Sequence, residues 1–162
     1  MNFKFNLGMV KILLVLIVAV FFTPFFFVSC GEGDSGASFS GFEVSVGKYV
    51  GGYWQEGNIF GFALIVLPAV MLVLSFLVFK NARIYSICRY LFFIAPLFDI
   101  FAAFIARYAF WVAASGKFGS IPVTIGIKPG FALYVFFNAA LFALSVRNYF
   151  KFSIFPVQDP SR

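Results

Sequence analysis

Four long apolar runs constrain the fold of this chain more than any other feature of its sequence. They lie near residues 10–29, 58–79, 87–115 and 129–147, and each contains few or no charged residues. A helix of about 20 apolar residues is long enough to cross the roughly 30 Å hydrocarbon core of a membrane. The sequence therefore predicts an all-α membrane protein in which residues 1–162 form one domain, a four-transmembrane-helix bundle.

Composition argues against a soluble domain and against catalysis. The chain is 62% hydrophobic and 11% charged, whereas soluble domains have about 25% charged residues. It contains no histidine, which is the commonest general base and metal ligand. Its two cysteines form no CxxC pair, and no glycine-rich phosphate loop or carboxylate pair is present. We therefore expect that the protein is not an enzyme, has no catalytic residue and binds no metal or cofactor.

The basic residues predict the orientation in the membrane. If both termini are cytoplasmic, eight lysines and arginines fall inside and three outside, which agrees with the positive-inside rule. The inner set is Lys4, Lys11, Lys80, Arg83, Arg89, Arg147, Lys151 and Arg162, and the outer set is Lys48, Lys117 and Lys128. The net charge of +6 then reflects topology, so we expect a multi-pass protein of the cell membrane whose partner is the lipid bilayer and not nucleic acid.

Two outer loops, residues 30–57 and 116–128, separate the predicted helices. Apolar residues alternate with polar ones or glycine over residues 42–46 and again over 123–127, which is the pattern of a half-exposed strand. We expect these two strands to pair in a small hairpin-like sheet. Aromatic residues that suit a membrane interface stand near the ends of the helices: Tyr53, Trp54 and Trp111.

The first apolar run allows two interpretations. It is long for a signal peptide and contains Pro24, which favours an uncleaved transmembrane helix. The sequence FVSC before Gly31 also resembles a loose lipoprotein cleavage box, in which Cys30 would be the lipid-modified residue. We favour the uncleaved helix and keep lipid modification of Cys30 as the alternative.

Three short motifs are PFFFVSCG after the first apolar run, SGFEVSVG in the following loop and KPGFAL at the start of the last. With these motifs the chain resembles uncharacterised bacterial four-helix integral membrane proteins, in which a Pro-Phe…Val-Ser-Cys-Gly pattern follows the first helix. The matching residues are Pro24, Phe25, Val28, Ser29, Cys30, Gly31, Ser40, Gly41, Gly47, Pro129 and Gly130. The resemblance implies the four-helix topology and no activity.

The third predicted helix places an aspartate, Asp99, near the middle of an apolar segment. At 100° per residue, Asp99 shares one face with small residues, and large residues occupy the opposite face. The small residues are Ala95, Ala102, Ala103, Ala106 and Ala113, and the large ones are Tyr90, Leu97, Phe101, Phe104 and Tyr108. Small residues allow close helix packing in lipid, so the alanine face should point into the bundle.

Arg107 follows Asp99 after about two helical turns, which is about 12 Å along the axis and about 80° around it. That spacing is poor for an ion pair within one helix. We therefore predict that Asp99 meets Asn138 or Tyr134 of the fourth helix. Arg107 should extend toward outer headgroups or loop carbonyls.

Three roles for Asp99 are open. It is a buried polar clamp, protonated because burial disfavours the charged form, it belongs to a proton or ion relay, or it contacts a membrane helix of a partner. At the level of the whole chain, we expect an accessory or scaffold protein without enzymatic activity, whose outer loops bind another membrane protein or a second copy. The alternative is a small oligomeric transporter or channel component that uses Asp99 and Arg107. A third possibility, a lipoprotein-like anchored protein, requires cleavage before Cys30.

Overall fold

The computed structural model describes the whole chain except residues 1–6, 31–35, 51–52, 78–81, 119–122 and 154–162. The described part is mostly helical, with five helices and two small sheets. In chain order the elements are α1 (Leu7–Phe21), β1 (Pro24–Cys30), β2 (Gly36–Ser40), α2 (Gly41–Val46), β3 (Gly47–Val50), β4 (Tyr53–Glu56), α3 (Ile59–Leu77), α4 (Ala82–Phe118), β5 (Val123–Ile127) and α5 (Pro129–Ser153).

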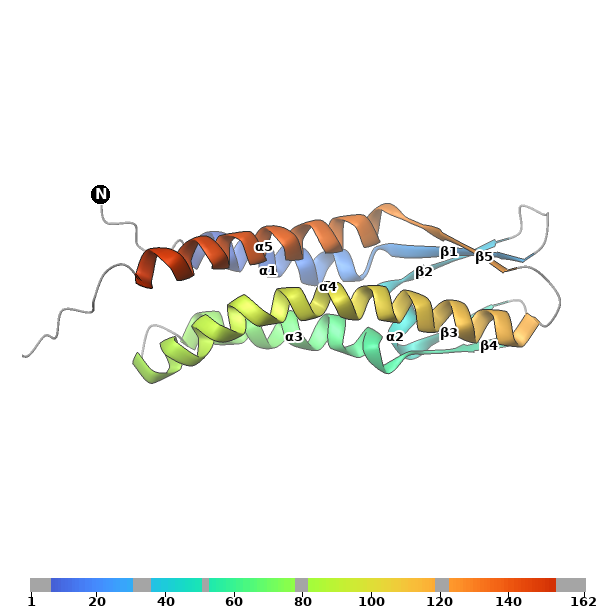
Figure 1. The fold of residues 1–162 in the computed structure, drawn as a ribbon. Helices are drawn as coiled ribbons and strands as arrows, with labels where there is room; N and C mark the ends of the chain where they lie inside the picture. Colours follow the sequence, from blue (N-terminus) through green and yellow to red (C-terminus); the bar gives the residue numbers. More distant parts are fainter. Residues whose placement is uncertain (1–6, 31–35, 51–52, 78–81, 119–122, 154–162) are drawn as a thin grey trace, which may run out of the picture.

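The four longer helices lie side by side along one axis, and the strands extend from one end of them (Figure 1). Helix α1 contacts α3 and α5, and α4 contacts the same two helices, so the four form a ring. Helix α4 has 37 residues and is about 55 Å long at 1.5 Å per residue. It therefore runs past the helical end and continues beside the strands.

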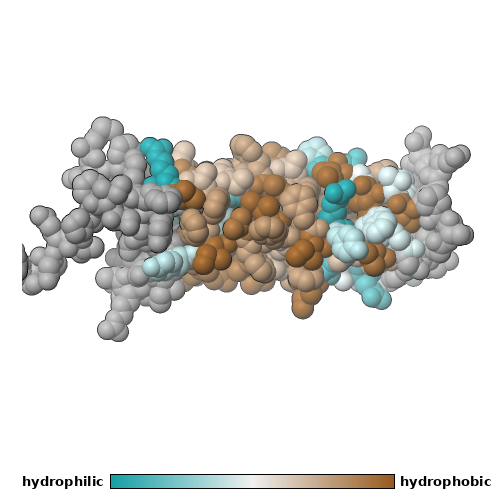
Figure 2. Space-filling view, viewed as in Figure 1, coloured by the Kyte–Doolittle hydropathy of each residue, from teal (hydrophilic) through white to brown (hydrophobic). Residues whose placement is uncertain are grey.

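Three helical segments are long and apolar enough to cross a membrane, by length and composition: Ile59–Leu77, Tyr90–Ser115 and Pro129–Arg147. The apolar helix Gly8–Phe21 is shorter. Large apolar side chains such as Ile59, Val73, Phe101 and Phe136 are at least 60% exposed. Hydrophobic residues form a broad apolar band across the middle of the face shown in Figure 2. An apolar band of this extent is typical of a surface that faces lipid.

The first helix is shorter than predicted, because α1 ends at Phe21 and residues 24–30 form β1. The residue before a proline is biased away from helical geometry, and Thr23 precedes Pro24 here. The Thr23 hydroxyl donates to the Val20 carbonyl over 2.7 Å at the end of the helix. Phenylalanine and valine then favour a strand. The prediction that residues 24–29 continue the helix is therefore wrong.

Strand β1 is the central strand of an antiparallel sheet with the order β2-β1-β5. Its register with β5 places Phe26 opposite Ile127 and Cys30 opposite Val123. The predicted strand at residues 123–127 is confirmed, but its predicted partner is wrong. Strand β5 pairs with β1, which also pairs with β2 on its other side.

Residues 42–46, predicted as a strand, lie instead in helix α2. The Ser40 hydroxyl accepts the Glu43 N–H, and the Glu43 carboxylate accepts the Ser40 N–H over 2.8 Å, which is a capping box. This reciprocal pair satisfies two N–H groups at the start of a helix. The Ser-x-x-Glu pattern thus outweighs the alternation of apolar residues that suggested a strand. Strand β3, which follows, pairs with β4 in the second sheet.

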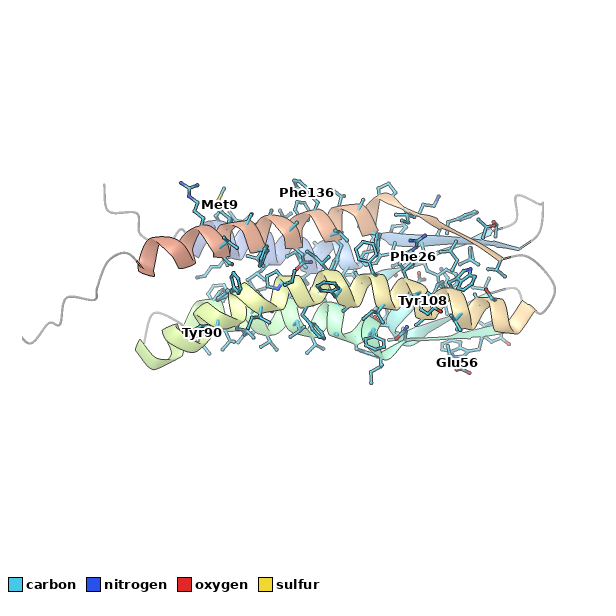
Figure 3. The ribbon with its side chains drawn as sticks, in the orientation of Figure 1. Met9, Phe26, Glu56, Tyr90, Tyr108 and Phe136 are labelled. Carbon is cyan, nitrogen blue, oxygen red and sulfur yellow. The ribbon has the colours of Figure 1, made fainter. Side chains whose placement is uncertain are left out.

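Aromatic packing joins the strands to the helices. The ring of Phe26 in β1 stacks on Phe110 of α4 at 6.0 Å, and Phe39 of β2 meets Phe110 at 4.9 Å. Phe26 points into the molecule, whereas Phe136 points away from it (Figure 3). Phe25 is fully buried against Tyr134 of α5 at 5.4 Å. The sheet and the helices therefore share one core.

Glu43 also pairs with Lys48 across the start of β3. Lys48 Nζ lies 2.7 Å from Glu43 Oε1, and both side chains are about one-third exposed. Partial burial alone would raise the pKa of Glu43, but Lys48 and the Ser40 N–H and hydroxyl outweigh it and hold the pKa below its ordinary value of 4.5. An acid whose pKa is lowered in the folded state stabilises that state above its ordinary pKa and loses the effect as pH falls through the lowered value.

We predict that acid unfolding of the outer region depends on Glu43. Glu43→Gln keeps the capping box but removes the ion pair, so it should cost about 0.5–1 kcal/mol at neutral pH, as partly exposed pairs do. It should also flatten the loss of stability below pH 4.5. Thermal unfolding followed by tryptophan fluorescence between pH 3 and 7 measures both effects.

The matched control is Glu56→Gln on β4, which should keep the acid-induced loss. An unchanged pH profile in Glu43→Gln would show that this ion pair does not stabilise the outer region.

Candidate functional site

Four polar side chains of the described helices are fully buried, and one of them, Ser75 of α3, donates to the Leu72 carbonyl of its own helix. The other three belong to α4 and α5. Asp99 comes from α4, and Tyr134 and Asn138 come from α5, and each is 0% exposed. We call these three residues the buried polar cluster. Polar groups inside an apolar interior cost free energy unless they are hydrogen-bonded. The buried polar cluster is therefore the candidate functional site of the described chain.

The alanine face of α4 brings Asp99 to the interior. Small residues on this face are buried: Ala95, Ala102, Ala103 and Ala106. Large residues on the opposite face are at least 40% exposed: Tyr90, Leu97, Phe101, Phe104 and Tyr108. The predicted facing of the helix is confirmed, with one exception. Ala113 is exposed and Ala114 is buried instead.

Two ring contacts define the register between the antiparallel helices α4 and α5. Phe93 meets Phe142 at 5.3 Å, and Phe104 meets Phe131 at 5.6 Å. Eleven residues separate the two rings on each helix, so the register is constant between them. On this register Asp99 is level with position 136, about 3 Å along the axis from Asn138. Side chains tilt toward the start of their own helix, which brings Asp99 and Asn138 toward one another.

Tyr134 meets a different partner from the predicted one. Its hydroxyl donates to the Leu64 carbonyl of α3 over 2.7 Å. In a regular helix that carbonyl accepts the N–H of residue 68, but residue 68 is a proline and has none. Tyr134 therefore supplies the donor that Pro68 removes. A proline inside a helix frees the carbonyl four residues earlier, so the sequence indicates that the Leu64 carbonyl needs a donor but not that Tyr134 supplies it.

Asn138 uses only part of its hydrogen-bonding capacity. Its Nδ2 donates to the Tyr134 carbonyl over 3.1 Å, which fixes the orientation of the amide because a carbonyl only accepts. Asn138 Oδ1 and both carboxylate oxygens of Asp99 have no hydrogen-bond partner among the described residues. No hydrogen bond joins Asp99 to Asn138 or Tyr134 among the described residues, so the predicted meeting of Asp99 with one of them stays a prediction.

Arg107 does not belong to the buried polar cluster. It is half-buried on α4, nearer the strands, and it does not reach the Asp99 oxygens. The predicted interface aromatics Trp54 and Trp111 are 50% and 44% exposed, and their rings pair with Tyr49 and Tyr108. The side chains of Cys30 and Tyr53 lie outside the described residues, so the predictions for them stay predictions.

The described residues contain no group of three or more histidine, cysteine, aspartate or glutamate side chains that could hold a metal ion. The cluster can accept hydrogen bonds, because three of its oxygens have no donor among the described residues. The cluster therefore suits a proton or a hydrogen-bond donor rather than a nucleophilic reaction.

Comparison with protein-family models, with curated proteins and with solved structures found no match.

We predict that Tyr134→Phe destabilises the protein by about 1–3 kcal/mol, because it leaves the buried Leu64 carbonyl without a donor. Pro68→Ala restores the missing N–H, so Tyr134→Phe should cost much less in the Pro68→Ala background. A double-mutant cycle of unfolding free energies in mild detergent measures this coupling.

The matched control is Tyr108→Phe, which removes a hydroxyl from a side chain that is 67% exposed and should change stability little. Equal costs of Tyr134→Phe with and without Pro68 would contradict the assignment.

Proposed function

We propose that the chain is an integral membrane protein that crosses the membrane four times, with both termini in the cytoplasm. It acts without enzymatic activity as an accessory or scaffold subunit, and its outer sheet binds a segment of another membrane protein. The observation that carries the proposal is the difference between the two edges of the sheet β2-β1-β5.

The fourth crossing combines α1 with the first residues of β1. Helix α1 has 15 residues and is about 22 Å long, which is short of a full crossing. Strand β1 continues in the same direction (Figure 1). Non-helical backbone is tolerated at membrane depth only where protein buries it. Because β1 is central, strands on both sides take up its main-chain groups, and Phe25 and Phe26 are buried.

The described charges support the orientation. Lys11, whose ammonium lies 3.9 Å from the centre of the Phe76 ring, is at the end where α1 begins and α5 ends (Figure 1). Arg147 belongs to the same end of α5. Lys48 and Lys128 belong to the strand end. By element, Arg83 and Arg89 at the start of α4 and Lys151 at the end of α5 also belong to the helical end, and Lys117 at the end of α4 belongs to the strand end. Five basic residues against three favour a cytoplasmic location for the helical side.

The place of β1 also favours an uncleaved chain. Cleavage before Cys30 would remove nearly all of β1 and leave β2 and β5 without the strand that joins them. It would also remove Phe25 and Phe26 from the shared core. The lipoprotein-like alternative therefore has less support than the uncleaved chain that crosses the membrane four times.

The hydrogen-bonding pattern tells which groups of β5 point outward. The Lys128 N–H donates to the Phe25 carbonyl over 2.8 Å, which marks that pair as hydrogen-bonded. Such pairs alternate in an antiparallel ladder. The main-chain groups of Val123, Ile125 and Ile127 therefore point away from β1.

The two edges of the sheet differ. On β2 the same alternation turns Ser38 outward, and Lys48 Nζ donates to its carbonyl over 3.0 Å. A lysine on an edge strand hinders the addition of another strand. On β5 no side chain of the described residues donates a hydrogen bond to the outward groups, although α4 packs against this strand, and Ile127 is 49% exposed. An open edge with an apolar residue suits the addition of an extended segment of a partner.

The partner is better supplied by another protein than by a second copy. The strands run roughly along the long axis of the molecule (Figure 1). Two copies with the same orientation in one membrane would therefore present parallel β5 strands, and parallel pairs are slightly less stable than antiparallel ones. An outer segment of another membrane protein can pair in either direction.

The transporter alternative has less support from the geometry. A route through Asp99 and Arg107 would need a continuous polar path, but Asp99 is 0% exposed and the residues around it on α4 are alanines. A packed apolar interior of this kind opposes the passage of ions.

We predict the topology as follows. In a background where Cys30 and Cys88 are replaced by serine, Thr124→Cys should react with a membrane-impermeant maleimide in intact cells. Ser161→Cys should react only after the cells are lysed. Labelling of Ser161→Cys in intact cells would refute the cytoplasmic C-terminus.

We predict that a photo-crosslinking residue at Ile127 forms one discrete adduct with another membrane protein in native membranes. The same residue at Phe136, which is 63% exposed on the apolar band, should not. Ile125→Pro should abolish the Ile127 adduct, because proline removes an outward N–H without removing a bond to β1.

The matched control is Ser38→Pro, which removes an outward N–H at the β2 edge and should leave the Ile127 adduct unchanged. An adduct that contains two copies of this chain would show self-association instead. An adduct that survives Ile125→Pro would refute strand addition at β5.

A further inference from the structure

We propose that Asp99 binds a proton in the native bundle and donates it to Oδ1 of Asn138, so that an acid–amide hydrogen bond joins α4 to α5. The inference is independent of the partner proposed for the outer sheet. It depends on the buried polar cluster alone.

The inventory of donors and acceptors leads to this assignment. The Tyr134 hydroxyl donates to the Leu64 carbonyl, and Asn138 Nδ2 donates to the Tyr134 carbonyl. Three buried oxygens remain without a partner among the described residues: Asp99 Oδ1, Asp99 Oδ2 and Asn138 Oδ1. Three acceptors without a donor cannot bond with one another. One proton on the carboxylate converts it into a donor as well as an acceptor.

Asn138 is the acceptor that the geometry favours. The register of α4 and α5 places Asp99 and Asn138 at nearly the same depth. Tyr134 is one turn from Asn138, and its hydroxyl is engaged with α3. The amide nitrogen of Asn138 faces its own helix, which leaves Oδ1 as the free acceptor on that side chain.

An ionised Asp99 would lack compensation. The carboxylate would be fully buried without a donor, and such an unpaired charge costs several kcal/mol in an apolar interior. Of the titratable side chains on the elements packed against α4 at this depth, Tyr134 is the one that faces Asp99. Helix α3 has none between Ile59 and Leu77, and Arg107 is about 12 Å away along α4. No described cation is therefore in place to balance the charge.

A metal cation suits the site less well than a proton. The carboxylate and the amide supply three oxygens. Hard divalent cations take about six or more oxygens. A proton needs only one donor and one acceptor.

The proton makes folding pH-dependent with a definite sign. In the native state Asp99 keeps its proton, whereas in the unfolded state it releases the proton once the pH exceeds the ordinary range of a carboxylic acid. The free energy of unfolding therefore falls as pH rises. In the range where only this proton differs, the unfolding equilibrium changes about tenfold per pH unit. Asp99→Asn supplies a permanent amide donor to Asn138 Oδ1, so it should fold as well as the native chain and lose this dependence.

The test uses the full chain in mild detergent. Infrared difference spectra between the native chain and Asp99→Asn should contain the carbonyl stretch of a protonated carboxylic acid at neutral pH. Asn138→Leu should shift that band, because it removes the acceptor. Absence of the band at neutral pH would overturn the proposal. If Asp99→Asn does not fold, the shift of the band between the native chain and Asn138→Leu provides the same test.

Unfolding between pH 5 and 9 in sodium chloride and in choline chloride provides the second arm. We expect the same pH-dependent loss of stability in both salts, and a flat profile for Asp99→Asn. A sodium-specific stabilisation that Asp99→Asn abolishes would overturn the proposal in favour of a bound metal cation.

Discussion

The bond from the Tyr134 hydroxyl to the Leu64 carbonyl is the contact on which the arrangement of the helices most depends. In an apolar interior, each main-chain group that loses its helical partner must find another within the protein. Pro68 creates that need at the centre of α3, and Tyr134 meets it from α5. Helices α3 and α5 are opposite members of the ring, because α1 and α4 each contact both of them. One hydrogen bond therefore joins two helices that lie opposite one another in the ring.

The second constraint is the change of the first apolar segment from helix to strand. After Pro24 ends the helix, the main-chain N–H and C=O groups of β1 need hydrogen-bonding partners. Strands β2 and β5 provide them. The close approach of α5 at this point requires a small residue. A Cβ on Gly130 would lie 2.5 Å from the Pro24 carbonyl oxygen. The start of α5 therefore packs directly on the first residue of β1, which keeps the sheet aligned with the helices.

Much of the helical part could be predicted from the sequence, and the reason is that one physical rule dominates it. Apolar length predicted the segments that form α3, α4 and α5, and the alanine face predicted the burial of Asp99. The strand at residues 123–127 followed from alternation, but its partner did not. Its partner β1 is continuous with an apolar helix, and hydropathy does not distinguish a buried strand from a buried helix. Helix α2 was missed because alternation was given more weight than the capping box, although Ser40 and Glu43 are plain in the sequence. The bond of Tyr134 to Leu64 required knowledge of which helices face each other across the ring.

Helix α4 makes the buried polar cluster and the outer sheet parts of one structure. Asp99 and Phe110 belong to the same uninterrupted helix, about 17 Å apart along its axis. Phe110 packs on Phe26 and Phe39, the central and edge strands of the outer sheet. A rigid helix transmits a displacement at one end to the other, so the position of α4 against α5 at Asp99 also sets the position of Phe110 under the sheet. An uncompensated charge at Asp99 would favour separation of α4 from α5, and the same movement would withdraw Phe110 from Phe26. The hydrogen bond that we propose between Asp99 and Asn138 would therefore also keep Phe110 packed under the outer sheet.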